Sequence, residues 1–368
     1  MKVLIAPDKF KGSLQAQEVC AVIREAIGND DTVCIPMADG GEGTCAILTE
    51  ANRGYTMTCD VVDPLGRSLS AAYGVSRDGR VAYVEMAAAS GLYLLQNHER
   101  DPLTTSTVGT GMMIRHAVES GVREIILTVG GSATCDGGMG MAAALGYVFL
   151  DRDGKELHPS GAALKCVSRI EAPGSGMDGV ILTVLCDVAN PLLGAQGAAQ
   201  VFAPQKGADT AAVHLLEEGL CNLASVVETQ LGRKMDVEFG GAGGGIAAGA
   251  RAFLNGTLVS GIHYIMDQLT IEDAIRSCDL VITGEGSLDR QSLSGKVVSG
   301  IGEVCRRHGK PFIIFCGVNK LDEREQRELG AVRVLPLVRE GISEEVAMTS
   351  AKELLNREVR RFFRERYP

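Results

Sequence analysis

The stretch KVLIAPDKFKGS at residues 2–13 decides the fold, because an apolar run that ends at Pro7 passes directly into a polar, lysine-rich loop. Apolar residues then recur at helical spacing up to Gly28, at Val19, Val22, Ile23 and Ala26. A short apolar run followed by such a spacing is typical of a buried strand and an amphipathic helix. The stretch therefore predicts a strand, a loop and a helix whose N-cap is Ser13.

The same order repeats along both ends of the chain. Residues 32–37 form a second apolar run, and the glycine-rich loop 39–43 precedes a helical stretch that ends near Gly54. Near the other end we expect strands at 280–283, 312–316 and 332–337, and helices at 297–308, 323–329 and roughly 344–366. Short apolar strands that alternate with helices form parallel sheets. The sequence predicts an α/β protein with a flavodoxin-like parallel sheet assembled from both chain ends.

Between these ends the pattern changes to antiparallel hairpins. Strand-like runs at 55–62, 68–76 and 80–86 are joined by Pro64-Leu65-Gly66 and Asp78-Gly79, which favour tight turns. Further buried strands are expected at 124–129 and 180–186, and a long helix at 212–231. We therefore predict a mixed α/β domain at 55–274, inserted into a first domain made of 1–54 and 275–368.

The composition limits the partners and the compartment. The net charge is −10, without a block of basic residues, which disfavours nucleic acid. The first residues lack the basic and apolar pattern of a signal peptide, so we expect none, and no apolar run is long enough to span a membrane. The eleven cysteines are an odd number with no C-x-x-C spacing, so we expect reduced, buried thiols and a cytoplasmic protein.

Glycine-rich segments near predicted strands are candidates for binding phosphate, because glycine permits close backbone approach and helix N-termini favour anions. We assign nucleotide binding to two such segments and to the lysine that begins a later helix: Gly40, Gly41, Gly43, Gly284, Gly286, Ser287 and Lys296. No Gly-Lys pair is followed by Ser or Thr, so a Walker A motif is absent. The segment at Gly138 and Gly140 matches a dinucleotide fingerprint only loosely.

Lysines and carboxylates follow several of the strands. Lys9 and Lys11 can neutralise a phosphate or a carboxylate, and with Asp8 we place them among the catalytic residues. Phosphoryl transfer also needs carboxylates that hold Mg²⁺ and an acid group that takes the proton of the attacking hydroxyl. We assign the metal to Asp39, Glu42, Glu285 and Asp289, and the base to Asp187, with Asp8 and Asp136 as alternatives. The six histidines show no paired metal-ligand spacing, which disfavours zinc chemistry.

Seven blocks in order give the sequence a resemblance to the bacterial glycerate kinase family. They are APDKFKGS (6–13), ADGGEGT (38–44), EMAAASGL (85–92), GGSAT (130–134), CDVANPL (186–192), FAPQKGA (202–208) and ITGEGSLD (282–289). The resemblance implies a kinase of D-glycerate that depends on ATP and Mg²⁺. It also implies a flavodoxin-like domain and a second domain like that of restriction endonucleases. The chain departs from the family pattern at Cys135 and Ala189, which we leave out of the site.

Within these blocks we assign substrate binding to Ser90, Ser132, Asp136, Asn190 and Lys206. The expected partners are D-glycerate and ATP, and the resemblance favours 2-phospho-D-glycerate over the 3-phosphate as product. Two alternatives stay open at this point, a nicotinamide-dependent hydroxyacid oxidoreductase and a non-catalytic sugar-acid sensor. The sequence leaves the oligomeric state open, a homo-oligomer included.

Overall fold

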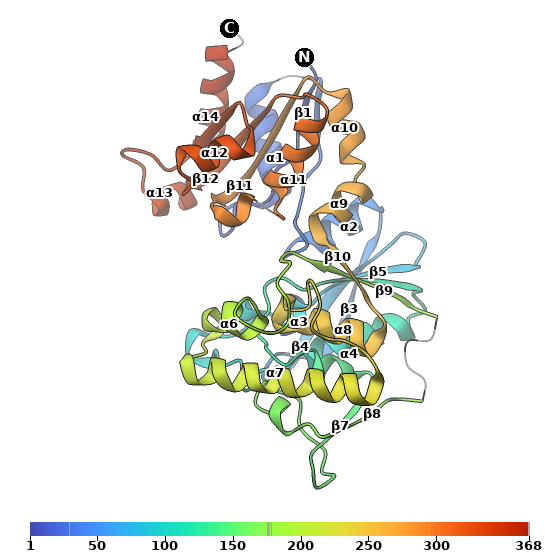
Figure 1. The fold of residues 1–368 in the computed structure, drawn as a ribbon. Coiled ribbons are helices and arrows are strands. Elements are labelled where there is room, and N and C mark those ends of the chain that lie inside the picture. Colours follow the sequence, from blue (N-terminus) through green and yellow to red (C-terminus); the bar gives the residue numbers. More distant parts are fainter. Residues whose placement is uncertain (29, 175–176, 178, 294, 367–368) are drawn as a thin grey trace. The chain divides into compact units, whose positions relative to one another are not determined.

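The computed structural model of the protein describes residues 1–28, 30–174, 177, 179–293 and 295–366. The chain divides into two compact units (Figure 1). One contains residues 1–39 and 262–368, and we call it the N/C unit. The other contains residues 40–261, and we call it the middle unit.

The N/C unit is built on a five-stranded parallel sheet in the order β13-β12-β11-β1-β2. Numbered by their order along the chain, these strands read 5-4-3-1-2, which is the flavodoxin-like order with its switch point beside β1. The strands are β1 (Val3–Ile5), β2 (Thr32–Cys34), β11 (Leu280–Leu288), β12 (Phe312–Asn319) and β13 (Arg333–Pro336). The predicted flavodoxin-like sheet from both chain ends is confirmed.

Helices of the N/C unit bury their apolar faces with this sheet. They are α1 (Ala16–Ile27), α9 (Gly261–Gln268), α10 (Ile271–Ser277), α11 (Val297–Arg307), α12 (Glu323–Leu329), α13 (Glu344–Thr349) and α14 (Ala351–Arg366). Val19 and Ile23 of α1 share one core with Leu355 and Val359 of α14. Burial of these two apolar faces, rather than helix propensity, holds both ends of the chain together.

Three local predictions for the N/C unit are wrong. The N-cap of α1 is Gln15, and the Ser13 hydroxyl instead donates to the carbonyl of Phe10. The final helix is two helices, because Ser350 leaves the helical conformation between α13 and α14. Strand β11 runs to Leu288, well past the predicted end at residue 283, since its second half pairs with β12.

The middle unit contains a six-stranded mixed sheet in the order β10-β9-β6-β5-β4-β3. Strands β3, β4 and β5 pair antiparallel, whereas β5, β6, β9 and β10 pair parallel. The six are β3 (Tyr55–Val62), β4 (Ser68–Val75), β5 (Val81–Glu85), β6 (Glu124–Thr128), β9 (Ile181–Cys186) and β10 (Thr257–Ser260), and a separate pair is β7 (Val148–Leu150) with β8 (Arg169–Glu171). The predicted hairpins and mixed second sheet are therefore present.

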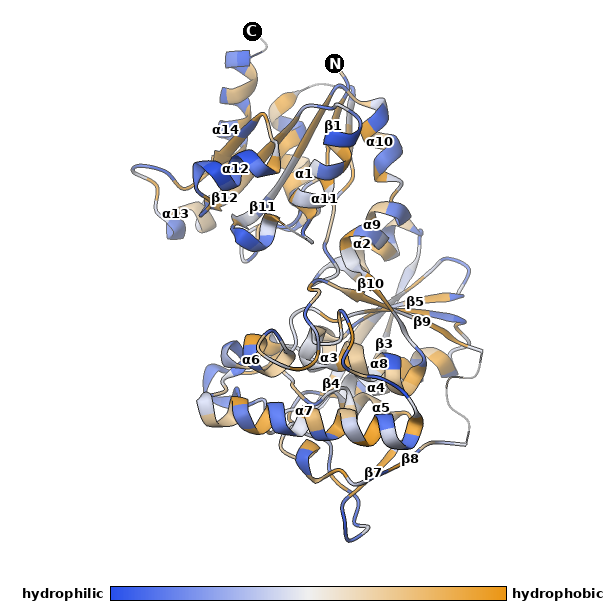
Figure 2. Ribbon diagram, viewed as in Figure 1, coloured by the Kyte–Doolittle hydropathy of each residue, from blue (hydrophilic) through white to orange (hydrophobic). Residues whose placement is uncertain are grey.

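The helices of the middle unit contribute, together with its strands, to its apolar core. They are α2 (Thr44–Ala51), α3 (Ala87–Ser90), α4 (Val108–Glu119), α5 (Met139–Ala144), α6 (Ala198–Phe202), α7 (Thr210–Leu231) and α8 (Ile246–Leu254). Figure 2 shows alternating hydrophilic and hydrophobic bands along α7, which buries Leu216, Leu220 and Leu223. Within the described residues, no helix combines the length and apolar character that a membrane crossing requires.

The unit boundaries differ from those expected at residues 55 and 274. Helix α2 packs on β4 and β5, so it belongs to the middle unit although the sequence repeats a strand-loop-helix pattern there. At the other boundary, Ile262 and Met266 of α9 lie against Gly300 of α11, which places α9 in the N/C unit. Packing partners, rather than the order of elements along the chain, set both boundaries.

Candidate active site

Three carboxylates meet at one edge of the N/C sheet. Asp8 follows β1, Asp39 lies beyond the end of β2, and Glu285 is in the second half of β11. Because β1 pairs with both β2 and β11 in parallel, the chain segments that leave these strands emerge side by side. All three side chains are buried, with exposed fractions of 9%, 7% and 8%.

Lys296 supplies the positive charge for this cluster. Its ammonium group lies 2.7 Å from a carboxylate oxygen of Asp39. It is the N-cap residue of α11, and its backbone N–H donates to the hydroxyl of Ser299. The lysine also lies close enough to Asp8 and Glu285 to favour their charged forms. One lysine therefore faces three buried carboxylates.

The two remaining carboxyl groups hold their protons unusually tightly. Burial, and then the negative charge of Asp39, raises the pKa of Asp8 to about 7. Burial also raises the pKa of Glu285 to about 8, although a hydrogen bond with Ser292 opposes the shift. The Oε1 atom of Glu285 and the hydroxyl of Ser287 are buried without a hydrogen-bond partner. A buried acceptor of this kind is costly unless a ligand or cation satisfies it.

The loop after β1 brings Lys9 and Lys11 to this region. The backbone N–H of Lys9 donates to Asp8 at 2.7 Å, and its charge favours the ionised form of Asp8. Lys9 is half-buried, whereas Lys11 is exposed. Only the first lysine is therefore part of the charge cluster at Asp8, and Lys11 lies on the surface of the same loop.

Gly284, Gly286 and Ser287 lie inside strand β11. The sequence pattern predicted that they form a loop before a helix, and that prediction is wrong. A methyl group on Gly284 would lie 2.1 Å from the carbonyl oxygen of Phe315, and one on Gly286 would lie 2.8 Å from the backbone nitrogen of Lys11. These glycines allow β12 and the Lys9–Lys11 loop to approach β11 closely. That steric demand explains the glycines without a phosphate.

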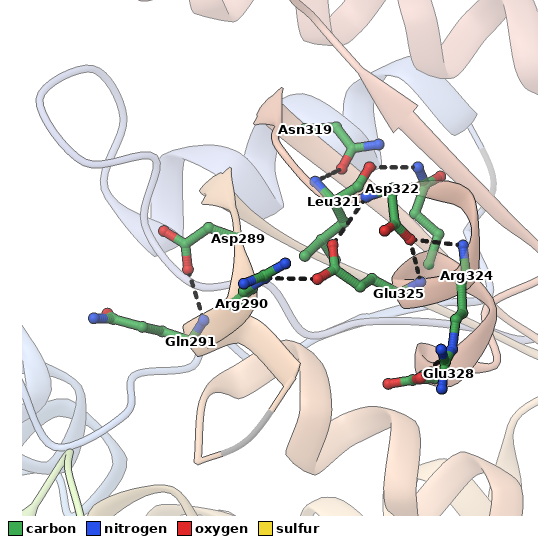
Figure 3. A network of polar contacts seen from close by, with 10 residues as sticks. Asp289, Arg290, Gln291, Asn319, Leu321, Asp322, Arg324, Glu325 and Glu328 are labelled. Atoms are coloured by element: carbon green, nitrogen blue, oxygen red, sulfur yellow. Dashed lines mark hydrogen bonds and ion pairs between the residues drawn. The ribbon is translucent and has the colours of Figure 1, made fainter.

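Asp289 lies just beyond β11 and caps a turn (Figure 3). Its carboxylate accepts from the backbone N–H of Gln291 at 2.9 Å, and its own N–H donates to Ser292. Next to it, Arg290 forms an ion pair with Glu325 at 2.7 Å. Of the four residues assigned to metal, Asp39, Glu285 and Asp289 lie in the N/C unit and Glu42 lies in the middle unit.

In the middle unit, the glycine loop before α2 packs on two other segments. Gly40 and Gly43 have positive φ angles, and the N–H of Gly43 donates to the carboxylate of Glu85. A methyl group on Gly130 would lie 2.7 Å from the Cα of Gly41 and 3.3 Å from a carboxylate oxygen of Asp187. Asp187, directly after β9, is therefore held beside two glycine loops.

Lys206 is buried at the same end of this sheet. Its side chain is 2% exposed and donates to the Ser132 hydroxyl at 2.6 Å and to the carbonyl of Thr134 at 2.7 Å. Burial lowers its pKa, although Cys135, Asp136 and Asp187 oppose the shift. Within the described part of the chain, Lys206 has no salt-bridge partner. A buried cation without a counter-ion is a natural site for an anion.

Ser90 and Asn190, also assigned to substrate, have partners within the protein. The hydroxyl of Ser90 is fully buried and pairs with that of Thr110 at 2.7 Å. The amide of Asn190 donates to the carbonyl of Gln196 at 2.8 Å. Both side chains therefore hold loops in place, whatever else they contact when substrate binds.

Asp136 has a structural environment that its sequence context did not reveal. It is fully buried, and its carboxylate accepts from the backbone N–H groups of Thr107, Gly138 and Gly140 and from the Thr107 hydroxyl. These bonds occupy the N-terminus of α5, where the loose fingerprint at Gly138 and Gly140 would need to bind a pyrophosphate. The arrangement favours a loop-holding role for Asp136 over substrate binding.

Replacing Asp136 with Asn should lower the free energy of unfolding by about 1–3 kcal/mol, because one N–H donor would then face an amide NH₂ group. Urea unfolding measures the change. Asp209→Asn is the matched control, since Asp209 caps α7 and Asn is an equally good N-cap. Equal stability of the two variants would show that the bonds to Asp136 contribute little.

Several residues of the two clusters carried no signal in the sequence. Ser292 pairs with Glu285 from a short turn that matches no motif. Tyr93 lies near Glu42 and Glu85, whose charges together with burial raise its pKa. Thr134 contributes a backbone carbonyl, which any residue at that position would supply.

Comparison with known proteins adds a consistent result. The family model described as "Glycerate kinase family" matches residues 3–366. A glycerate 2-kinase from Escherichia coli is 43% identical, covering 86% of this chain and 85% of its own. A glycerate kinase from Halalkalibacterium halodurans is 39% identical, covering 97% and 96%.

A solved structure is similar over nearly the whole chain. It is the crystal structure of a protein described as glycerate kinase 2 from Salmonella typhimurium LT2. It superposes with a TM-score of 0.83 at 39% identity and covers 99% of this chain and 98% of its own. With a family match over both units and relatives of full length, the chain belongs to the glycerate kinase family.

Proposed function

We propose that this protein transfers the γ-phosphoryl group of ATP to the 2-hydroxyl of D-glycerate, giving 2-phospho-D-glycerate and ADP. One observation in the structure supports this proposal in addition to the family relationship. Asp8 and Glu285 are buried with raised pKa values beside the Asp39–Lys296 ion pair, at the ligand-binding edge of a flavodoxin-like sheet. We also propose that the protein acts in the cytoplasm, where ATP is available and where its free cysteines would stay reduced.

The N/C cluster fits a magnesium ion brought by a nucleotide. Among the described residues, no three His, Cys, Asp or Glu side chains are grouped as a complete metal cage. Kinases hold Mg²⁺ through one or two carboxylates together with the phosphates of the nucleotide. Glu285, with its unpartnered Oε1, and Asp8 offer such carboxylate oxygens. When bound, Mg²⁺ would neutralise charge on the phosphates during transfer.

The lysines of this unit would stabilise the transferred group. Lys296 is held at the start of α11 by its ion pair with Asp39, and the charge of Lys9 favours the ionised form of Asp8. Both are half-buried, so their charges are less screened by water than surface charges would be. We propose that Lys296 contributes to nucleotide binding in this unit. Gly284 and Gly286 instead support the site indirectly, because they let β12 and the loop of Lys11 pack closely on β11.

The middle unit would hold glycerate. Two of the three N–H donors of Lys206 bond to Ser132 and Thr134, and a substrate carboxylate would supply the counter-charge that the buried ammonium group needs. Asp187 lies beside Gly130 and would accept the proton of the attacking hydroxyl. Its position after a buried strand fixes its backbone, as a general base requires.

The direct test uses D-glycerate, ATP and Mg²⁺ with ³¹P NMR of the product. A phosphate on the secondary carbon couples to one proton and gives a doublet, whereas one on the primary carbon gives a triplet. We expect the doublet, with no product from L-glycerate. A triplet would overturn the 2-hydroxyl assignment, and ATP hydrolysis without acceptor phosphorylation would overturn the kinase.

Replacing Lys206 with Met should lower kcat/KM for glycerate by about 10- to 100-fold, mainly through KM, because a charge-assisted hydrogen bond contributes about 1.5–3 kcal/mol. The KM for ATP should change little. Lys206→Arg keeps the charge, and Lys165→Met removes an exposed lysine of the same unit as a control. An equal rise in both KM values would indicate a general loss of folding.

Lys9→Ala should lower kcat/KM for ATP at least about tenfold, which corresponds to roughly 1.4 kcal/mol of transition-state stabilisation. Lys11→Ala changes an exposed residue of the same loop, so it should lower kcat/KM for ATP less than Lys9→Ala does. Steady-state kinetics with each variant decides between them. Wild-type kinetics in both would leave the loop with a structural role only.

A further inference from the structure

Two cysteines of the N/C unit lie together, although the sequence shows no paired spacing between them. Cys20 is on α1, and Cys34 ends the edge strand β2. The sulfur of Cys34 lies 3.8 Å from the carbonyl oxygen of Cys20, and the two thiols lie close enough to influence each other's ionisation. The sulfur of Cys20 lies 3.8 Å from the carbonyl oxygen of Ile5 in β1. The pair therefore joins a helix to the edge of the sheet.

The two thiols have unlike surroundings. Cys20 is 3% exposed, while Cys34 is half-buried and within reach of water. Arg24, one helical turn after Cys20, lies on the same face of α1 and brings its positive charge close to Cys34. The neighbouring Cys20 thiol and then the Arg24 guanidinium lower the pKa of Cys34 to about 6, whereas the same thiol pairing raises the pKa of Cys20. Cys34 is thus the nucleophilic thiol, and Cys20 keeps its proton.

We propose that Cys34 and Cys20 form a peroxide-sensitive dithiol that closes reversibly into an intramolecular disulfide, with Cys34 the attacked residue and Cys20 the resolving one. The placement of an accessible thiol, a guanidinium and a second, buried thiol at one junction of α1 with the sheet supports it. None of the other nine cysteines has a thiol partner among the bonds of the described residues.

The chemistry needs only hydrogen peroxide as oxidant. The Cys34 thiolate attacks one peroxide oxygen, the O–O bond breaks, and the leaving hydroxide takes up the proton that Cys34 released, so Cys34 becomes a sulfenic acid. The Cys20 sulfur then bonds to the Cys34 sulfur as the S–O bond breaks. The Cys20 proton leaves with that hydroxyl as water. Two thiols are oxidised by two electrons, and one peroxide is reduced to two waters.

The position of the pair links it to the candidate site. Asp39 lies five residues after Cys34, and the intervening segment extends the pairing with β1. The N–H of Ile35 donates to Ile5 at 2.9 Å, and that of Met37 donates to Pro7 at 2.9 Å. The carbonyl of Ile5 that receives the Ile35 bond is also the one nearest the Cys20 sulfur. The disulfide would therefore form where the segment carrying Asp39 is attached to the sheet.

The test treats the full-length reduced protein at pH 7 with a small excess of hydrogen peroxide, then blocks remaining thiols with N-ethylmaleimide. Trypsin and Asp-N together place Cys20 in peptide 12–24 and Cys34 in peptide 31–38, each with no other cysteine. Mass spectrometry should find these two peptides cross-linked, with a loss of two titratable thiols that dithiothreitol restores. Recovery of Cys34 as its maleimide adduct, while the exposed Cys166 and Cys221 are oxidised, would overturn the proposal.

Three variants separate the roles. Cys34→Ser should abolish the cross-link, and Cys20→Ser should leave a sulfenic acid on Cys34 that dimedone traps. Arg24→Gln should slow disulfide formation several-fold at pH 7. Cys166→Ser is the control, since that thiol is exposed, and its cross-link yield should equal that of the wild type. A Cys34→Ser protein that still loses two thiols at the wild-type rate would contradict the assignment.

Discussion

Asp187→Asn should lower kcat by about 10²- to 10⁴-fold while the KM values change less than a few-fold. The hydroxyl of glycerate is a very weak acid, so a carboxylate that accepts its proton in the transition state contributes a factor of this size. Asn keeps the size and one oxygen of the side chain but cannot take the proton. The local backbone should persist, because Asp187 follows a strand that pairs on both sides.

The same variant distinguishes a base from a metal ligand. If Asp187 held Mg²⁺, part of the lost activity would return at high metal concentration, since the missing contribution would then be binding. A base shows no such recovery. Asp236→Asn is a suitable control, because Asp236 also caps a loop of the middle unit through its carboxylate. Retention of kcat within a few-fold at every metal concentration would exclude both roles and direct attention to Asp8, whose pKa of about 7 also suits a base.

The sequence predicts the sheet of the N/C unit well because its strands are short, fully buried apolar runs. Val3–Ile5 and Phe312–Cys316 have no polar residue on either face, which only a strand covered by helices on both sides tolerates. The second half of β11 could not be recognised in the same way. Gly284 and Gly286 weaken a strand by composition, and their purpose is visible only when Phe315 and the Lys11 backbone lie against them.

Some features of the candidate site could likewise be predicted from the sequence, and others could not. The edge that gathers Asp8, Asp39 and Glu285 follows from parallel topology, so their proximity could be anticipated from strand ends alone. Asp136 has the same kind of sequence context, yet the backbone N–H and the hydroxyl of Thr107, about thirty residues away, determine its role. The burial of Lys206 likewise depends on the loop of Ser132 and Thr134, which no local pattern connects to residue 206. The environments of Asp136 and Lys206 therefore depend on contacts between loops far apart in the sequence, which hydrophobic periodicity does not reveal.

Glu285→Gln should remove much of the loss of stability that the metal-free protein shows as pH rises. The folded pKa of Glu285 is about 8 and its ordinary value is 4.5, so the folded state binds the proton more tightly than the unfolded state. The stabilisation from that proton is complete below about pH 4. It is lost as pH rises through 8, by an amount on the order of 4 kcal/mol for a shift of this size.

Urea unfolding in EDTA at pH 5, 7 and 9 measures this effect. Gln carries no charge at any pH, so Glu285→Gln should resemble the wild type at pH 5 and exceed its stability at pH 9. Glu303→Gln, which changes an exposed carboxylate on α11, should follow the wild-type curve throughout. Parallel curves for the wild type and Glu285→Gln would show that this carboxyl ionises at its ordinary pKa despite its burial.

Adding Mg²⁺ with a non-hydrolysable ATP analogue at pH 9 extends the same experiment to function. The cation should bind the ionised carboxylate and relieve the cost of its burial, so the wild type should gain stability that depends on metal concentration. Glu285→Gln should gain much less, because its amide is a weak ligand for Mg²⁺ and has no charge for the ion to neutralise. An equal gain in both proteins would place the metal away from Glu285, and Asp39→Asn would then be the next variant to compare, since Asp39 is the carboxylate that pairs with Lys296.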